Sequence, residues 1–145
     1  MEAGILRLNT ELNGILLDTH VLYFLDSDPA EVPAKILSVI QSPSTRVFVS
    51  SLTPWEMSIK HQMGRWPEVG DLLADYHQTM VAYGFTELPF QSDAALFAGS
   101  LPLIHKDPFD RGLIAQAVSH KLKFISADEF VQSYVGEVVG LFVDW

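Results

Sequence analysis

The strongest constraint on the fold is a short, uninterrupted apolar run that ends in an acid, Gly14-Ile15-Leu16-Leu17-Asp18. A strand with one face in water alternates apolar and polar residues, whereas a central parallel strand covered on both faces is apolar throughout. The run therefore predicts a central strand that ends at Asp18. Segments rich in β-branched and aromatic residues predict further strands at residues 46–50, 85–88, 123–126 and 138–143.

The same helix-start pattern occurs twice. In Thr53-Pro54-Trp55-Glu56 and in Asp107-Pro108-Phe109-Asp110, a capping residue precedes a proline, and an acid follows three residues after the cap. These helices are expected to end near Met63 and Lys121. Other helices are predicted at residues 19–25, 32–41, 69–82 and 92–99, with a short one after Asp128. The alternation predicts an α/β fold, a three-layer α/β/α sandwich around a mostly parallel central sheet.

Length and composition fit one globular domain over residues 1–145, with residues 1–13 as a short extension or edge strand. Hydrophobic residues make up 48% of the chain and charged residues 19%, which argues against disorder. The chain has no cysteine, and no run approaches the roughly 20 apolar residues that span a bilayer. We therefore expect a cytoplasmic protein with no membrane partner.

Four acids share one predicted location. Asp18 ends the first strand, Glu56 and Asp110 lie in first helical turns, and Asp128 follows the strand at 123–126. In an open α/β sheet these positions line one crevice, where converging carboxylates repel unless a cation bridges them. Carboxylate oxygens suit Mg²⁺ or Mn²⁺, and such ions support phosphodiester hydrolysis.

The net charge of −9 disfavours a nucleic-acid partner. Carboxylates around a bound cation contribute to this charge without repelling phosphate, which weakens the objection. Each acid also has a structural interpretation. Glu56 and Asp110 suit helix starts in any protein, and Asp128 suits a turn inside a capping box of Ser126 and Glu129. Asp18 is harder to explain in this way, because no charge partner lies nearby in the sequence.

At these acids the sequence resembles the PIN-domain ribonucleases, in particular the VapC-type toxins of bacterial toxin–antitoxin pairs. The resemblance implies a PIN-like fold in which Asp18, Glu56, Asp110 and Asp128 bind Mg²⁺ or Mn²⁺ and catalyse RNA cleavage. Ser126 stands where many relatives carry threonine, and it keeps a hydroxyl that can orient a metal ligand or water. The matching segments are Ile15-Leu16-Leu17-Asp18-Thr19-His20, residues 51–60, residues 105–117 and Phe124-Ile125-Ser126-Ala127-Asp128.

The resemblance also implies partners. VapC-type toxins are usually homodimers that a small VapB-like antitoxin neutralises. The antitoxin lies in an apolar groove and reaches the active site with a basic residue. Candidates for that groove are the first two helices and the surroundings of Trp55, Met63 and Trp66, although core packing is the alternative for these side chains.

Several other basic residues and histidines have candidate roles. Arg111 is expected either to contact substrate phosphate or a carboxylate, or to form a surface salt bridge. His20 is expected beside Asp18. Lysines at 60, 106, 121 and 123 form either a basic rim for RNA or ordinary solvated surface. The remaining histidines have no metal-ligand spacing and are interpreted as structural or surface residues: His61, His77, His105 and His120.

Two other classes of function place acids at similar positions. Haloacid-dehalogenase-type phosphatases need a second Asp two residues after the first, where this chain has His20, and receiver domains need an acidic pair that Asp18-Thr19 lacks. A non-catalytic PIN-like module that binds protein or RNA remains the alternative, with the acids serving only as helix caps.

Overall fold

The computed structural model describes residues 12–145, so an extension or edge strand over residues 1–11 lies outside the described part. Within that part, five strands form one sheet in the order β3-β2-β1-β4-β5, and every adjacent pair is parallel. The predicted α/β class is confirmed, and the sheet is parallel throughout. The strands are β1 (Ile15–Leu17), β2 (Val47–Ser50), β3 (Thr86–Leu88), β4 (Lys123–Ile125) and β5 (Val143–Asp144).

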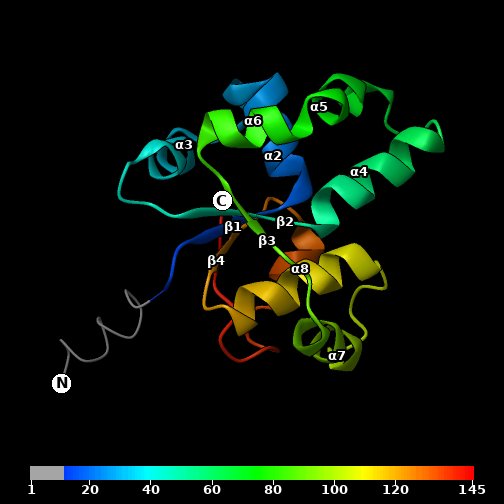
Figure 1. Ribbon diagram of the computed structural model, residues 1–145. Coiled ribbons are helices and arrows are strands. Elements are labelled where there is room, and N and C mark those ends of the chain that lie inside the picture. Colours follow the sequence, from blue (N-terminus) through cyan, green and yellow to red (C-terminus); the bar gives the residue numbers. More distant parts are fainter. Residues whose placement is uncertain (1–11) are drawn as a thin grey trace.

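Helices cover both faces of the sheet. Figure 1 shows α2, α3, α5 and α6 on one face and α7 and α8 on the other. The α-helices are α2 (Thr19–Ser27), α3 (Ala34–Gln41), α4 (Leu52–Gln62), α5 (Gly70–Ala74), α6 (Tyr76–Tyr83), α7 (Ser92–Ser100), α8 (Pro108–Ser119) and α9 (Glu129–Gln132). Two short 3-10 turns, η1 (Pro29–Glu31) and η2 (Pro67–Val69), lie between them.

The central strand β1 divides the core into two clusters. Ile15 and Leu17 pack with residues of α2 to α6, whereas Leu16 packs with residues of α8 and α9 on the opposite face. All three side chains are buried. This burial on both faces explains the uninterrupted apolar run, since a parallel strand between two helical layers has no solvent face.

Several boundaries differ from the sequence prediction. The helix expected over residues 69–82 is divided between α5 and α6. The strand expected over residues 138–143 is reduced to β5, because Gly136 and Gly140 adopt positive φ angles of 91° and 87° and turn the chain before it reaches the sheet. Helix α4 begins before Thr53, which was predicted as its cap, so Glu56 lies beyond the first helical turn in which it was predicted. The Oγ of Ser50 accepts the Leu52 amide at 3.0 Å, so strand β2 passes almost directly into the helix.

The strand order places one crevice at the centre of the sheet. The chain moves from β1 outward to β2 and β3, then crosses back to β4 on the other side of β1. In open parallel sheets, a reversal of this kind leaves a crevice at the carboxyl ends of the two central strands. Asp18 follows β1 and Ser126 follows β4, so both lie at this position.

Candidate active site

Asp18 is held from two sides at the end of β1. Its Oδ1 accepts the Thr19 amide at 2.8 Å, and its Oδ2 accepts the Ser126 hydroxyl at 2.6 Å. Burial, with smaller contributions from the charges of Glu56 and Asp128, raises the pKa of Asp18 to about 6 against the lowering effect of these bonds. Asp18 is therefore a fixed carboxyl group in a site with excess negative charge.

Glu56 enters the same site from α4, where it is buried. Its Oε1 accepts the Thr19 hydroxyl at 2.7 Å, and its Oε2 forms an ion pair with Lys60 at 2.5 Å. Burial lowers the pKa of Lys60, but the bond to Glu56 and the charges of Asp107 and Asp110 outweigh this effect and raise it overall. Lys60 is thus a positive charge held within the site.

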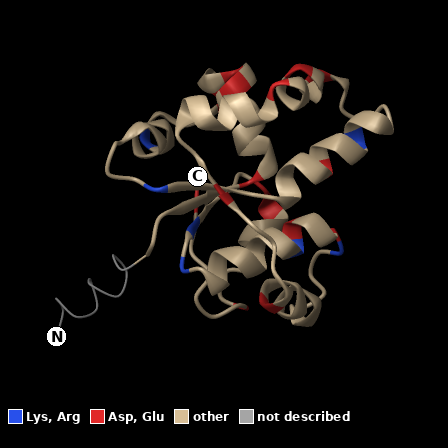
Figure 2. Cartoon of the chain, in the orientation of Figure 1, with Lys and Arg blue, Asp and Glu red and all other residues tan. Residues whose placement is uncertain are grey.

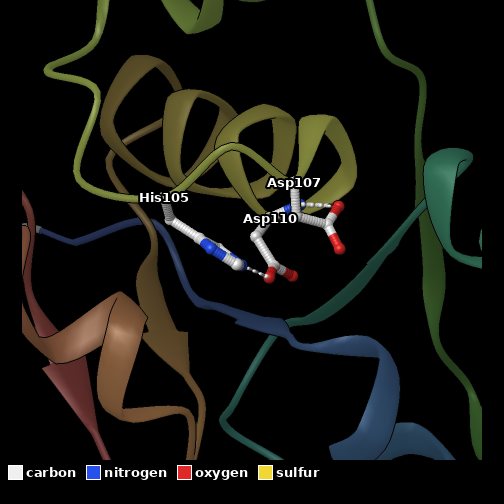
Figure 3. A group of neighbouring side chains, drawn as sticks. All are labelled: His105, Asp107 and Asp110. Carbon is white, nitrogen blue, oxygen red and sulfur yellow. Dashed lines mark hydrogen bonds and ion pairs between the residues drawn. The ribbon is translucent and has the colours of Figure 1, made fainter.

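Asp110 lies in the first turn of α8, and Asp107 caps that helix as predicted. The Oδ1 of Asp107 accepts the Phe109 amide at 2.8 Å and the Asp110 amide at 3.4 Å. The Oδ2 of Asp110 lies 2.7 Å from the Nε2 of His105, and Figure 3 shows the two side chains pointing toward each other. Burial, followed by the charges of Asp18, Asp107, Glu56 and Asp128, raises the pKa of Asp110 to about 8.

Asp128 lies at the edge of the site, half-buried, and caps α9. Its Oδ1 accepts the Phe130 amide at 2.7 Å, and its own amide donates to the Ser126 Oγ at 3.1 Å. Ser126 therefore connects Asp18 with the Asp128 backbone and does not form the capping box considered from the sequence. A carboxylate with one oxygen engaged in capping retains a second oxygen for other ligands.

A single pocket of about 440 Å³ gathers these side chains. Figure 2 shows acidic residues where β1 ends, within α4 and where α8 begins. Lys60 is the only lysine or arginine among the described residues that line the pocket, so one ammonium faces a larger set of carboxylates. The acids of the lining are Asp18, Glu56, Asp107, Asp110 and Asp128.

A model of the PIN domain family matches residues 15–135. The chain belongs to the PIN domain family. The match spans β1 through the segment after α9, so it includes every acid of the pocket. A comparison with curated protein sequences found no match.

Three solved structures that share this fold come from different bacteria. The structure of VapBC2 from Rickettsia felis, bound to a DNA fragment from the VapBC2 promoter, has a TM-score of 0.65 at 10% sequence identity. The match covers 90% of this chain and 96% of that chain. DNA-bound VapBC from Salmonella typhimurium has a TM-score of 0.62 at 15% identity, with the same coverage. A toxin–antitoxin complex from Klebsiella pneumoniae has a TM-score of 0.60 at 21% sequence identity, and the match covers 91% of this chain and 97% of that chain. At sequence identities this low, the similarity shows a shared fold and nothing more.

Arg111 of this PIN domain has a different position from the one expected. It is buried, and its guanidinium donates to five backbone carbonyl oxygens and to the Tyr134 hydroxyl. No carboxylate pairs with it among residues 12–145. It holds the end of α7 and the following loop, instead of a phosphate, a site carboxylate or a surface salt bridge. The carbonyls belong to Ala98, Gly99, Leu101, Pro102 and His105.

Asp107, interpreted from the sequence only as a helix cap, also lines the pocket, and His105 is a second site residue that the sequence interpretation missed. It was assigned a structural or surface role because no histidine or cysteine has zinc spacing around it. In the structure it lines the pocket and contacts Asp110. A possible signal was its position two residues before the Asp107 cap. The loop that folds it back, however, also depends on a contact with Tyr134, which is remote in the sequence.

Other expected residues lie at or near the pocket in different ways. His20 lines it but is exposed, with its ring stacked on Trp66 at a centroid distance of 4.5 Å. Trp66 is buried, whereas Trp55 and Met63 are exposed. The lysines at 121 and 123 lie before and at the start of β4, at the end of the strand opposite to the pocket.

The donor set of the pocket fits a divalent cation. After burial, the negative charges of neighbouring acids raise the pKa of Asp18 and of Asp110, and this repulsion is what a bound cation removes. In addition, His105, Asp107 and Asp110 each place a potential ligand atom within 4.8 Å of the others.

Among the described residues, no helix is long and apolar enough to cross a membrane.

We predict that the metal-free protein loses stability as pH rises from about 4 to about 8. Asp18 and Asp110 have pKa values of about 6 and about 8, above the ordinary value of 3.8. They therefore bind protons more tightly in the folded state, and ionisation costs stability on the order of a few kcal/mol. Thermal denaturation in chelator at pH 5 and pH 8 measures the effect. An Asp110→Asn variant with the same pH dependence as the wild type would contradict the assignment.

Proposed function

We propose that this PIN domain is a divalent-metal-dependent endoribonuclease that hydrolyses phosphodiester bonds in RNA. The observation that carries the proposal is the convergence of Asp18, Glu56, Asp110 and Asp128 in one pocket, where burial and repulsion from neighbouring acids raise the pKa of Asp18 and of Asp110. A purely structural site gains nothing from this repulsion, whereas a cation site requires concentrated negative charge.

In this proposal the four acids hold Mg²⁺ or Mn²⁺. When bound, the cation offsets the negative charge of the phosphodiester and activates water for attack on phosphorus. The chain itself orients the ligands. Ser126 and the Thr19 amide fix the two oxygens of Asp18, and the Thr19 hydroxyl fixes one oxygen of Glu56. Side chains held in this way need little reorganisation when the cation binds.

Lys60 explains how the site tolerates its charge before a cation binds. Its ammonium group partly neutralises the charge of the Glu56 carboxylate and lies near Asp107 and Asp110. We infer that a cation shares or replaces this contact. Lys60, released from Glu56, then provides a positive charge for a substrate phosphate at the pocket mouth. This role is narrower than the basic rim considered from the sequence.

We further propose that the enzyme is the toxin of a toxin–antitoxin pair, acts as a homodimer and is neutralised by a VapB-like antitoxin. The structures that share the fold include two VapBC complexes and a toxin–antitoxin complex. The net charge of −9 favours a basic partner segment. An apolar pocket of about 290 Å³ beside Trp55 and Phe109 offers a surface for apolar side chains of the antitoxin.

The test is incubation of the purified protein with a panel of structured RNAs in Mg²⁺, in Mn²⁺ and in chelator. We expect cleavage within single-stranded regions with either metal and none in chelator. Cleavage that persists in chelator would reject the metal-dependent mechanism. Binding of RNA or antitoxin without cleavage of any RNA would favour the non-catalytic binding module.

A further inference from the structure

One side of the pocket carries a nitrogen donor as well as carboxylates. The Nε2 of His105 lies 2.7 Å from the Oδ2 of Asp110, and the carboxylate of Asp107 lies beside them (Figure 3). The three potential ligand atoms lie within 4.8 Å of one another. Ligand atoms around one cation lie roughly 3–4 Å apart, so small side-chain shifts would bring all three to a common ion.

The position of His105 is determined by contacts on three sides. Its imidazole stacks on the Phe130 ring at a centroid distance of 4.7 Å and an interplanar angle of 6°. Its amide donates to the Tyr134 hydroxyl at 2.9 Å, and its carbonyl accepts from Tyr134 at 3.1 Å and from Arg111 at 3.3 Å. A donor held at both ring and backbone loses little entropy when it coordinates a cation.

The carboxylates near His105 also have more free oxygen atoms than those across the pocket. Asp18 and Glu56 each use both oxygens in contacts with the chain. Within residues 12–145, Asp107 and Asp110 each use one oxygen and keep the other for a ligand. The free oxygens and the nitrogen of His105 therefore gather at the start of α8.

We propose that His105 coordinates the active-site cation through Nε2, so that the centre has a mixed imidazole–carboxylate ligand set and prefers Mn²⁺ to Mg²⁺. Imidazole is a good ligand for first-row transition ions, whereas Mg²⁺ favours oxygen ligands and water. This inference rests on the proposed metal-dependent function. It adds a ligand that the four acids alone do not include, and it assigns the class of cation.

The test is pulsed electron paramagnetic resonance of the purified, metal-stripped protein loaded with Mn²⁺. We expect modulation from a directly coordinated ¹⁴N nucleus in the wild type and none in His105→Gln. Isothermal titration is expected to show that His105→Gln weakens Mn²⁺ binding about tenfold and Mg²⁺ binding much less. Glutamine can still hydrogen-bond to Asp110, so a role limited to orienting that carboxylate would be largely retained.

A second histidine provides the matched comparison. His20 lines the same pocket but stacks on Trp66. His20→Gln is expected to keep the nitrogen modulation, and loss of the signal in that variant instead would overturn the assignment to His105. Wild-type protein labelled with ¹⁵N-histidine, which needs no substitution, is expected to replace the ¹⁴N modulation with that of ¹⁵N.

The outcomes separate this inference from the proposed function. Mn²⁺ binding with no nitrogen modulation overturns the role of His105 and leaves the nuclease proposal intact. Nitrogen modulation without RNA cleavage supports the ligand assignment and rejects the nuclease. Absence of Mn²⁺ binding by the wild type overturns both.

Discussion

Asp18→Asn and Asp110→Asn are each expected to lower the rate of RNA cleavage by at least about 100-fold, because an amide carries no charge to hold the catalytic cation. The fold should tolerate both changes. In the metal-free protein these carboxyl groups are buried beside other acids, so removing their charge at pH 8 leaves the melting temperature equal or higher. Initial cleavage rates at saturating Mg²⁺ or Mn²⁺, together with thermal denaturation in chelator, measure the two effects.

Asp93→Asn is the matched control. Asp93 also lies in the first turn of a helix, α7, but it is exposed and outside the pocket. It is expected to keep wild-type cleavage and to change stability by no more than about 0.5 kcal/mol. A purified Asp18→Asn or Asp110→Asn variant that cleaves RNA at the wild-type rate would contradict the catalytic assignment.

Arg111→Ala is expected to lower the free energy of unfolding by about 3 kcal/mol, because it leaves a set of backbone carbonyl oxygens and the Tyr134 hydroxyl without their buried donor. This corresponds to a decrease in melting temperature of roughly 10 °C for a domain of this size. Thermal and urea denaturation measure the loss.

Two further substitutions separate geometry from charge at this position. Arg111→Lys keeps the positive charge but lacks the planar fork of donors, so it should recover only part of the loss. Arg65→Ala removes an exposed arginine and is expected to change the free energy of unfolding by no more than about 0.5 kcal/mol. A loss below about 1 kcal/mol for Arg111→Ala would show that the loop is held mainly by other contacts.

Local sequence patterns predicted much of the fold correctly. The apolar run at residues 14–18 and the Asp107-Pro108 helix start depend on neighbouring residues alone, and both appear as β1 and α8. The prediction was wrong at the start of α4. Thr53 has the properties of a cap, but Ser50 takes the first amide of α4 and Thr53 lies inside the helix, 3.4 Å from the hydroxyl of Thr19.

The sequence alone determined the parallel α/β class and the four acids at strand and helix ends, because hydrophobic periodicity and capping chemistry are local. The tertiary structure decided what surrounds those acids. It buried Arg111 among carbonyls beside Tyr134, joined Asp18 to Ser126 and stacked His105 on Phe130. These contacts depend on how α7, α9 and the loops pack around the sheet. Short-range patterns do not encode that packing, because burial and side-chain partners arise only when remote segments meet.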